Sequence, residues 1–171
     1  MLEWNTISLL LKHMEWADAK VWMSVLVTSS ADNDSSIKKI LYHIHAVQRA
    51  FFYIWTKQPL EFPKETDFPK LIEIAKWGCK YHTKIDEYLK TFDEDDLNQS
   101  LDIPWANKLE EIIGKKPVNP SLVETMLQVT IHSAYHRGQV NKRLRDLGGE
   151  PQLIDFIVWV WKGKPKADWK I

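Results

Sequence analysis

Cysteine is almost absent from this sequence of 171 residues: only Cys79 occurs, which excludes a disulfide framework within the chain. Such sparse cysteine is typical of a reducing compartment, and we expect a cytoplasmic protein. Long apolar runs are also lacking, since the run from residue 156 to residue 161 is far too short to cross a bilayer. The first twenty residues lack the basic and apolar regions of a secretory signal. We therefore expect neither a membrane-spanning segment nor a targeting segment.

An excess of either charge is lacking as well, because 23 basic residues balance 23 acidic ones. No overall field then favours a nucleic acid or an anionic membrane as a partner. The length suits a single domain over residues 1–171 that can bury a core without disulfides or a structural metal. Nine tryptophans are many for this size, and we interpret them as filling gaps between helices. A groove for a carbohydrate or an aromatic ligand is the alternative.

Apolar residues spaced three and four apart predict four long helices, near residues 4–27, 35–55, 69–92 and 119–147. The first shows one apolar face made of Leu10, Met14, Ala17, Val21 and Val25. Asp34 or Ser35 is placed to cap the second helix, and Gly148-Gly149 to end the fourth. A short last helix is expected near 153–161. Four such helices predict an all-α fold, a four-helix bundle.

The segment 93–119 is the least helical part of the chain, with turn residues, short apolar runs and prolines. It could hold a small hairpin between the third and fourth long helices. This long connection leaves the order of the helices open on the pattern alone.

A polar stripe runs along the predicted helix 119–147, because its members recur at spacings of three and four: Thr125, Gln128, His132, His136, Gln139 and Arg143. The stripe is either a solvated face or a core-facing site. Apolar residues on the opposite side favour the core (Val123, Leu127, Ile131 and Ala134), as does the use of histidine and glutamine rather than lysine and glutamate. In the second half of this helix the side opposite the stripe carries Arg137, Asn141 and Arg145, which favours a solvent-exposed side there. A metal ion would satisfy such a stripe in the core.

His132 and His136 lie one helical turn apart, roughly 6 Å along the axis, so their rings can converge on one ion. A tight site needs a third ligand. His43 shares the apolar face of the second helix with Ile40, Val47, Ala50 and Ile54, whereas His45 lies beside the solvent boundary. We therefore predict a divalent transition-metal site formed by His43, His132 and His136. Gln128 or Gln139 is placed to hold a ligand ring, and Gln139 or Arg143 to steer an anionic group.

The other candidates are weaker. His13, near the apolar face of the first helix, is an alternative fourth ligand or a partner of one. His82 is expected at the surface or in packing. Cys79 lies outside the polar stripe, so we do not predict a nucleophile there, and no general base is identifiable.

Two stretches resemble the DinB family of metalloenzymes, also called DinB/YfiT-like: LYHIHAVQRAFFYIW at 41–55 and LQVTIHSAYHRGQVNKRLRDLGGEPQLIDFIVW at 127–159. In the second stretch HSAYHRGQV, LRDLGGEP and then Asp155 match the family pattern in order and spacing. The resemblance implies a four-helix bundle with up-down-down-up connectivity, often dimeric. It also implies nickel, zinc or a similar ion on His43, His132 and His136. One position differs from the family pattern, because family members often have asparagine at the position of Asp18.

Three neutral imidazoles leave coordination positions open, which marks catalytic sites more than structural ones. Proteins of this kind include thiol-dependent transferases and isomerases. The leading hypothesis is therefore a metal-dependent S-transferase that uses a low-molecular-weight thiol and a small-molecule substrate. Three alternatives remain: a metal-dependent hydrolase, a stress-induced binding protein for a metal or small ligand, and an interaction module with tryptophan-rich faces.

Overall fold

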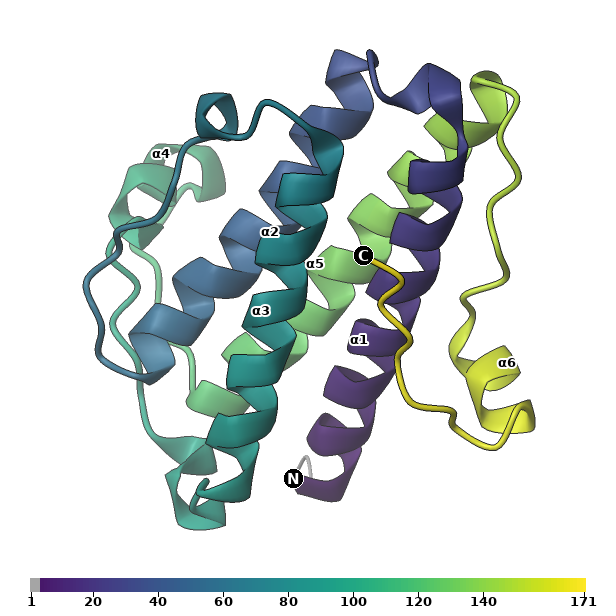
Figure 1. Ribbon diagram of the computed structural model, residues 1–171. Helices are drawn as coiled ribbons and strands as arrows, with labels where there is room; N and C mark the ends of the chain where they lie inside the picture. Colours follow the sequence, from purple (N-terminus) through teal and green to yellow (C-terminus); the bar gives the residue numbers. More distant parts are fainter. Residues whose placement is uncertain (1–3) are drawn as a thin grey trace.

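The computed structural model describes residues 4–171, and within them all regular secondary structure is helical (Figure 1). The four long helices are α1 (Trp4–Val27), α2 (Ser35–Trp55), α3 (Leu71–Lys90) and α5 (Leu122–Asp146). Two short helices, α4 (Glu110–Ile113) and α6 (Phe156–Trp161), follow α3 and α5. The all-α prediction and the four long helices are confirmed, with bounds that differ by at most a few residues.

The helix ends follow from capping residues. The carboxylate of Asp34 accepts a hydrogen bond from the backbone N–H of Ile37 and so caps α2. Ser121 and Glu124 form a reciprocal capping box at the start of α5. Gly148 adopts a left-handed conformation with φ of 79°, which ends α5 as the sequence predicts.

The long helices lie side by side (Figure 1). α1 packs against α3 and α5, and α2 packs against the same two helices. The connection of residues 56–70 returns to the end where α2 begins, so α3 runs in the same direction as α2 (Figure 1). After α5 the chain turns back along α1, where Trp159 packs against Trp16 in a small apolar cluster.

No strand forms between residues 93 and 119, so the expected hairpin is wrong. The segment instead contains two 3-10 helices, η3 (Glu94–Asn98) and η4 (Ala106–Leu109), followed by α4. One isolated antiparallel bridge joins Ser100 to Ser121. Pro104 and Pro117 lack the N–H that a strand ladder needs. In this segment Leu97, Leu101 and Ile103 are buried against the helices, whereas Ile112 and Val118 are exposed.

A buried polar network lies between the two apolar clusters of the core and joins all four long helices. Asp18 of α1 is its centre. One carboxylate oxygen accepts a hydrogen bond from Arg137 at 2.7 Å, and the other accepts from Gln48 at 2.7 Å and pairs with His82 at 3.0 Å. Burial alone would raise the pKa of Asp18, but Arg137 and His82 outweigh it and hold that pKa well below its usual value.

His45 belongs to the same network. Its Nε2 accepts a hydrogen bond from the indole of Trp22 at 2.9 Å, so its Nδ1 carries the proton and donates to Gln48 Oε1 at 2.8 Å. Burial lowers the pKa of His45 to about 4, which keeps the ring neutral. Both ring nitrogens of His45 are therefore paired, whereas Nε of Arg137 is buried without a hydrogen-bond partner.

Several sequence expectations are wrong here. His45, expected beside solvent, is only 1% exposed, and His82 is buried against Asp18 rather than at the surface. Arg137 and Asn141, expected on a solvated back of α5, are buried as well. These polar residue types resemble a surface in sequence because their partners lie on other helices, which the pattern of one helix does not reveal.

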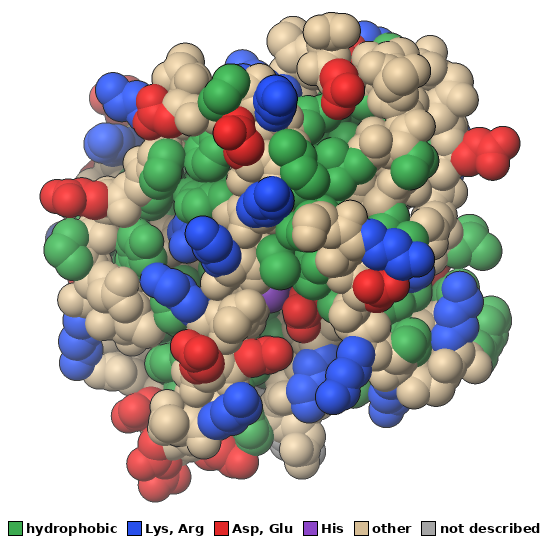
Figure 2. Space-filling model, viewed as in Figure 1, with side chains coloured by type: hydrophobic (Ala, Val, Ile, Leu, Met, Phe, Trp, Pro, Cys, Tyr) green, Lys and Arg blue, Asp and Glu red, His purple; other side chains and the backbone are tan. Residues whose placement is uncertain are grey.

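No helix in the described part of the chain has both the length and the apolarity to cross a membrane. On the face shown in Figure 2, acidic and basic side chains are interspersed among apolar ones. The balance of charge in the sequence is thus also a local balance on that face.

Candidate metal centre

Three histidine side chains from two helices converge. Nε2 of His132 lies 3.2 Å from Nε2 of His43 and 3.1 Å from Nε2 of His136. One ligand atom of each ring lies within 4.8 Å of the other two. Among residues 4–171, no other group of three or more histidine, cysteine or acidic side chains converges in this way. The structure therefore brings together the three residues that the sequence singled out, and the group could hold a metal ion.

Helix geometry and helix packing place the three rings. His132 and His136 are four residues apart on α5, which places their rings on one face, edge to face, at a centroid distance of 4.4 Å. His43 reaches them from α2, the helix that packs most extensively against α5. Its ring stands nearly perpendicular to that of His136, at 82°.

The burial of the group differs from the sequence prediction. His43 is exposed, and His132 and His136 are only half-buried. The prediction that His43 faces the core is wrong, because α2 is rotated about its axis relative to the orientation that the apolar pattern predicts. Its core face is formed by Leu41, Ile44, Gln48, Phe52 and Trp55, while Ile40, Val47, Ala50 and Ile54 are half-buried. The centre thus opens to solvent at the edge between two helices.

The polar stripe of α5 also lies at this edge rather than in the core. Gln128 is exposed, Gln139 and Arg143 are half-buried, and Thr125 alone is buried. Ile131, on the opposite side, is 57% exposed, so the apolar argument for a core-facing stripe fails. The face of α5 that enters the core carries Met126, Val129, Ser133, Arg137 and Val140.

The electrostatics of the group favour neutral rings. Burial, followed by repulsion from His136 and His43, lowers the pKa of His132 to about 4. Partial desolvation of the His43 ring, followed by repulsion from His136, also lowers the pKa of His43, although the residue as a whole is exposed. Only the neutral imidazole can donate its lone pair to a metal. Both rings are therefore in the ligating form near neutral pH.

The residues fit a divalent ion. In a tetrahedral site with metal–nitrogen bonds of about 2.0–2.1 Å, two ligand nitrogens are roughly 3.3 Å apart, close to the 3.1 and 3.2 Å found here. Hydrogen bonds alone do not explain the arrangement, because Nε2 of His132 faces two other Nε2 atoms and carries at most one proton. One cation would satisfy all three atoms together.

A glutamine holds one of the rings. Gln139 Oε1 lies 2.7 Å from Nδ1 of His136, so that nitrogen donates to the amide and Nε2 is free to ligate. Nδ1 of His132 is buried with no hydrogen-bond partner, and Gln128 forms no bond to it. Arg143 binds the carboxylate of Asp34 at the start of α2, and its role in steering an anion stays a prediction.

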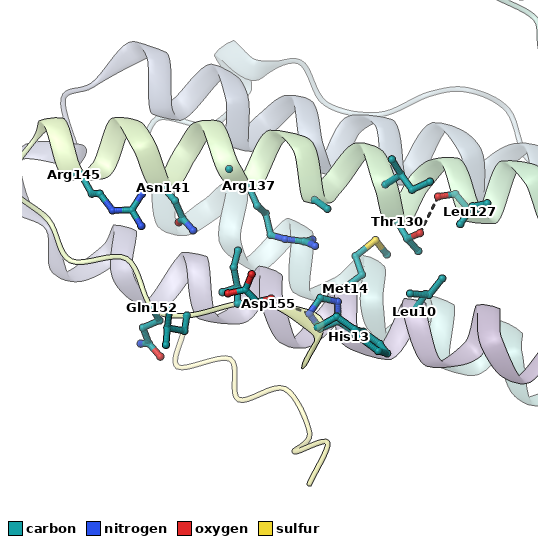
Figure 3. A pocket seen from close by; sticks show the side chains of 16 residues that line it. Leu10, His13, Met14, Leu127, Thr130, Arg137, Asn141, Arg145, Gln152 and Asp155 are labelled. Carbon is teal, nitrogen blue, oxygen red and sulfur yellow. Dashed lines mark hydrogen bonds between the residues drawn. The ribbon is translucent and has the colours of Figure 1, made fainter. Parts of the chain in front are cut away.

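His13 lies outside the group. Its Nε2 is 2.9 Å from the carbonyl oxygen of Ile154, beside a different cavity. That cavity measures about 720 Å³ and lies between α1, α5 and residues 152–156 (Figure 3). Figure 3 shows Arg137 and Asn141 extending toward it from α5. None of the three converging histidines lines it, so His13 is not supported as a fourth ligand.

Comparison with protein-family models gave no match, and no curated protein matched the chain at a significant level. No relative therefore supplies a function for the three histidines.

Proposed function

We propose that this chain is a DinB-like metalloprotein whose His43, His132 and His136 hold one divalent transition-metal ion such as nickel or zinc. The convergence of three Nε2 atoms carries the proposal, with separations that match a tetrahedral edge. The proposal includes a four-helix bundle with up-down-down-up order of the helices. The course of α1, α2, α3 and α5 supports that order, because α2 and α3 run in one direction and α1 and α5 in the other (Figure 1).

When bound, a divalent ion acts as a Lewis acid that lowers the pKa of a thiol and polarises a carbonyl. The chain's own residues prepare the site for it. Gln139 keeps the proton of His136 on Nδ1, and burial keeps His132 neutral, which its lowered pKa of about 4 reflects. The exposed ring of His43 leaves one side of the centre accessible to a small molecule.

The activity we propose is thiol-dependent S-transfer. The resemblance of residues 41–55 and 127–159 to the DinB family supports this reaction class. The chain supplies no thiolate of its own at the centre, because Cys79 lies on α3 outside the group and burial raises its pKa. The thiol would therefore come from a low-molecular-weight cosubstrate.

A substrate screen at fixed zinc loading tests the activity. 1-Chloro-2,4-dinitrobenzene is offered with and without added cysteine, and 4-nitrophenyl acetate is offered without any thiol. We expect turnover of the first compound that needs both zinc and thiol and is lost in His132→Ala. Thiol-independent ester cleavage would favour a metal-dependent hydrolase. Stoichiometric zinc binding without any turnover would favour a non-enzymatic binding protein for a metal or small ligand.

A further inference from the structure

A second cavity, of about 320 Å³, lies directly beside His132. Val47, Ala50 and Phe51 of α2 line one side of it. Gln128 and His132 of α5 line another, so the cavity and the candidate metal centre share a residue. A molecule that reached the histidines could therefore place part of its body in this cavity.

Two connecting segments complete the walls with aromatic rings. Trp105 comes from the stretch before η4 and meets Phe51 edge to face, with ring centroids 5.4 Å apart. Phe62 comes from the connection after α2 and packs against Trp77 of α3 at 6.1 Å. Because each ring is held by a neighbour from another element, the aromatic walls are formed without a ligand.

No lining residue of this cavity carries a charge, and the polar ones are Gln128 and His132. Without a metal ion on His132, an ionised group that entered would lose hydration and gain no opposite charge from the walls, which is unfavourable. An apolar cavity of about 150 Å³ holds one benzene molecule, so 320 Å³ suits one ring with a substituent, or two rings. The small volume of this cavity and its uncharged walls together favour a small, uncharged, apolar ligand.

We infer that this cavity binds the uncharged, apolar part of the substrate, an aromatic or short acyl group, beside the metal centre. The inference rests on the proposed metal site for its link to turnover, but the cavity exists independently of an ion. Charged groups of a thiol cosubstrate remain in water on the exposed side of His43. Trp105 and Ala50 are the specificity-determining positions, because one forms a wall and the other leaves space.

Benzamide and benzoate are suitable probes, because they have nearly the same size and differ in charge. Their binding is followed by the indole N–H signals of ¹⁵N-labelled protein, with and without zinc. The signal of Trp105 is identified as the one that Trp105→Phe removes. We expect benzamide to shift this signal in both forms and, in the zinc-free form, to bind with a Kd at least about tenfold below that of benzoate. Equal binding of both probes to the zinc-free protein, or an unmoved Trp105 signal, would overturn the inference.

A matched pair of substitutions locates the bound probe. Ala50→Leu fills the cavity and should weaken benzamide binding by about tenfold or more. Ala134→Leu makes the same change at an exposed position that lines the larger cavity on the other side of α5, and should leave binding unchanged. The reverse result would place the probe in the larger cavity and overturn the inference.

Zinc content separates this inference from the proposed function. Ala50→Leu should retain zinc like the unmodified chain, because it does not touch the three histidines. Zinc retention that needs His132, without benzamide binding at Trp105, would refute the cavity assignment alone. Benzamide binding at Trp105, with zinc content indifferent to His132→Ala, would refute the metal centre alone.

Discussion

Nε2 of His43 lies 3.2 Å from Nε2 of His132, although the two residues are 89 positions apart in the sequence. The contact depends on the packing of α2 against α5, and it adds a third ring to the pair that α5 carries one turn apart. The separation is close to that of two nitrogen ligands on one tetrahedral ion. The predictions below follow from this contact and from the buried network beneath it.

Gln139 should strengthen metal binding without touching the ion. Its amide oxygen accepts a hydrogen bond from Nδ1 of His136, which fixes the tautomer and the ring. We expect Gln139→Ala to weaken zinc affinity by roughly 10- to 100-fold in competition with a chelator. Gln128→Ala is the control and should change the affinity little, because Gln128 bonds to none of the three rings. Equal effects of the two substitutions would remove Gln139 from this role.

Zinc should be released from the three histidines only at a pH well below neutral. Because the pKa of His43 is lowered and that of His132 is lowered to about 4, protons compete with the metal only well below neutral pH. We expect zinc content, measured after gel filtration, to hold constant from about pH 8 to about pH 6.5 and to fall between about pH 6 and pH 4. Circular dichroism shows whether the helices persist there. Zinc retained undiminished at about pH 4 by folded protein would argue against imidazole ligands.

The pairing of Asp18 with Arg137 should be essential for stability. Both side chains are 2% exposed, so loss of the carboxylate leaves a buried cation without a partner. We expect Asp18→Asn to lower the free energy of unfolding in urea by about 3–5 kcal/mol. Asp146→Asn removes one partner of the exposed pair with Lys142 and should cost less than about 1 kcal/mol. Similar small losses for both would contradict the network.

Gly78 permits the close approach of α3 to the ring of His45. A Cβ added there would lie 2.4 Å from two atoms of that ring. Gly78→Ala should therefore lower the free energy of unfolding by about 1–3 kcal/mol, despite the better helix propensity of alanine. Gly138→Ala on α5 meets nothing within 4 Å and should be neutral or stabilising by up to about 1 kcal/mol. The close packing would be refuted by a neutral Gly78→Ala.

The helices and the histidine pair were predictable because both depend on local rules. Asp34, Ser121 and Gly148 mark helix ends through their own side chains or backbone. The spacing of His132 and His136 fixes their shared face whatever α5 packs against.

The rotation of α2 was not predictable in the same way, because it depends on the partners of that helix. Gln48 and Arg49 are buried, and their partners lie on α1, α3 and α5. In the sequence Gln48 and Arg49 resemble residues of a solvent-exposed face. The sequence therefore predicts that His43 is buried and His45 lies near solvent, whereas the structure shows the reverse. The glycine at position 78, opposite His45, is the one local sign of that burial, and it is meaningful only once α2 and α3 are placed together.

The most direct test of the metal centre is elemental analysis of the chain purified without an affinity tag and refilled with zinc. We predict about one ion per chain, and almost none in His43→Ala, His132→Ala or His136→Ala at unchanged helical content. His13→Ala, which removes a half-buried histidine outside the group, should keep its ion. Equal zinc content in His132→Ala and the unmodified chain, or no zinc in either, would contradict the three-histidine site.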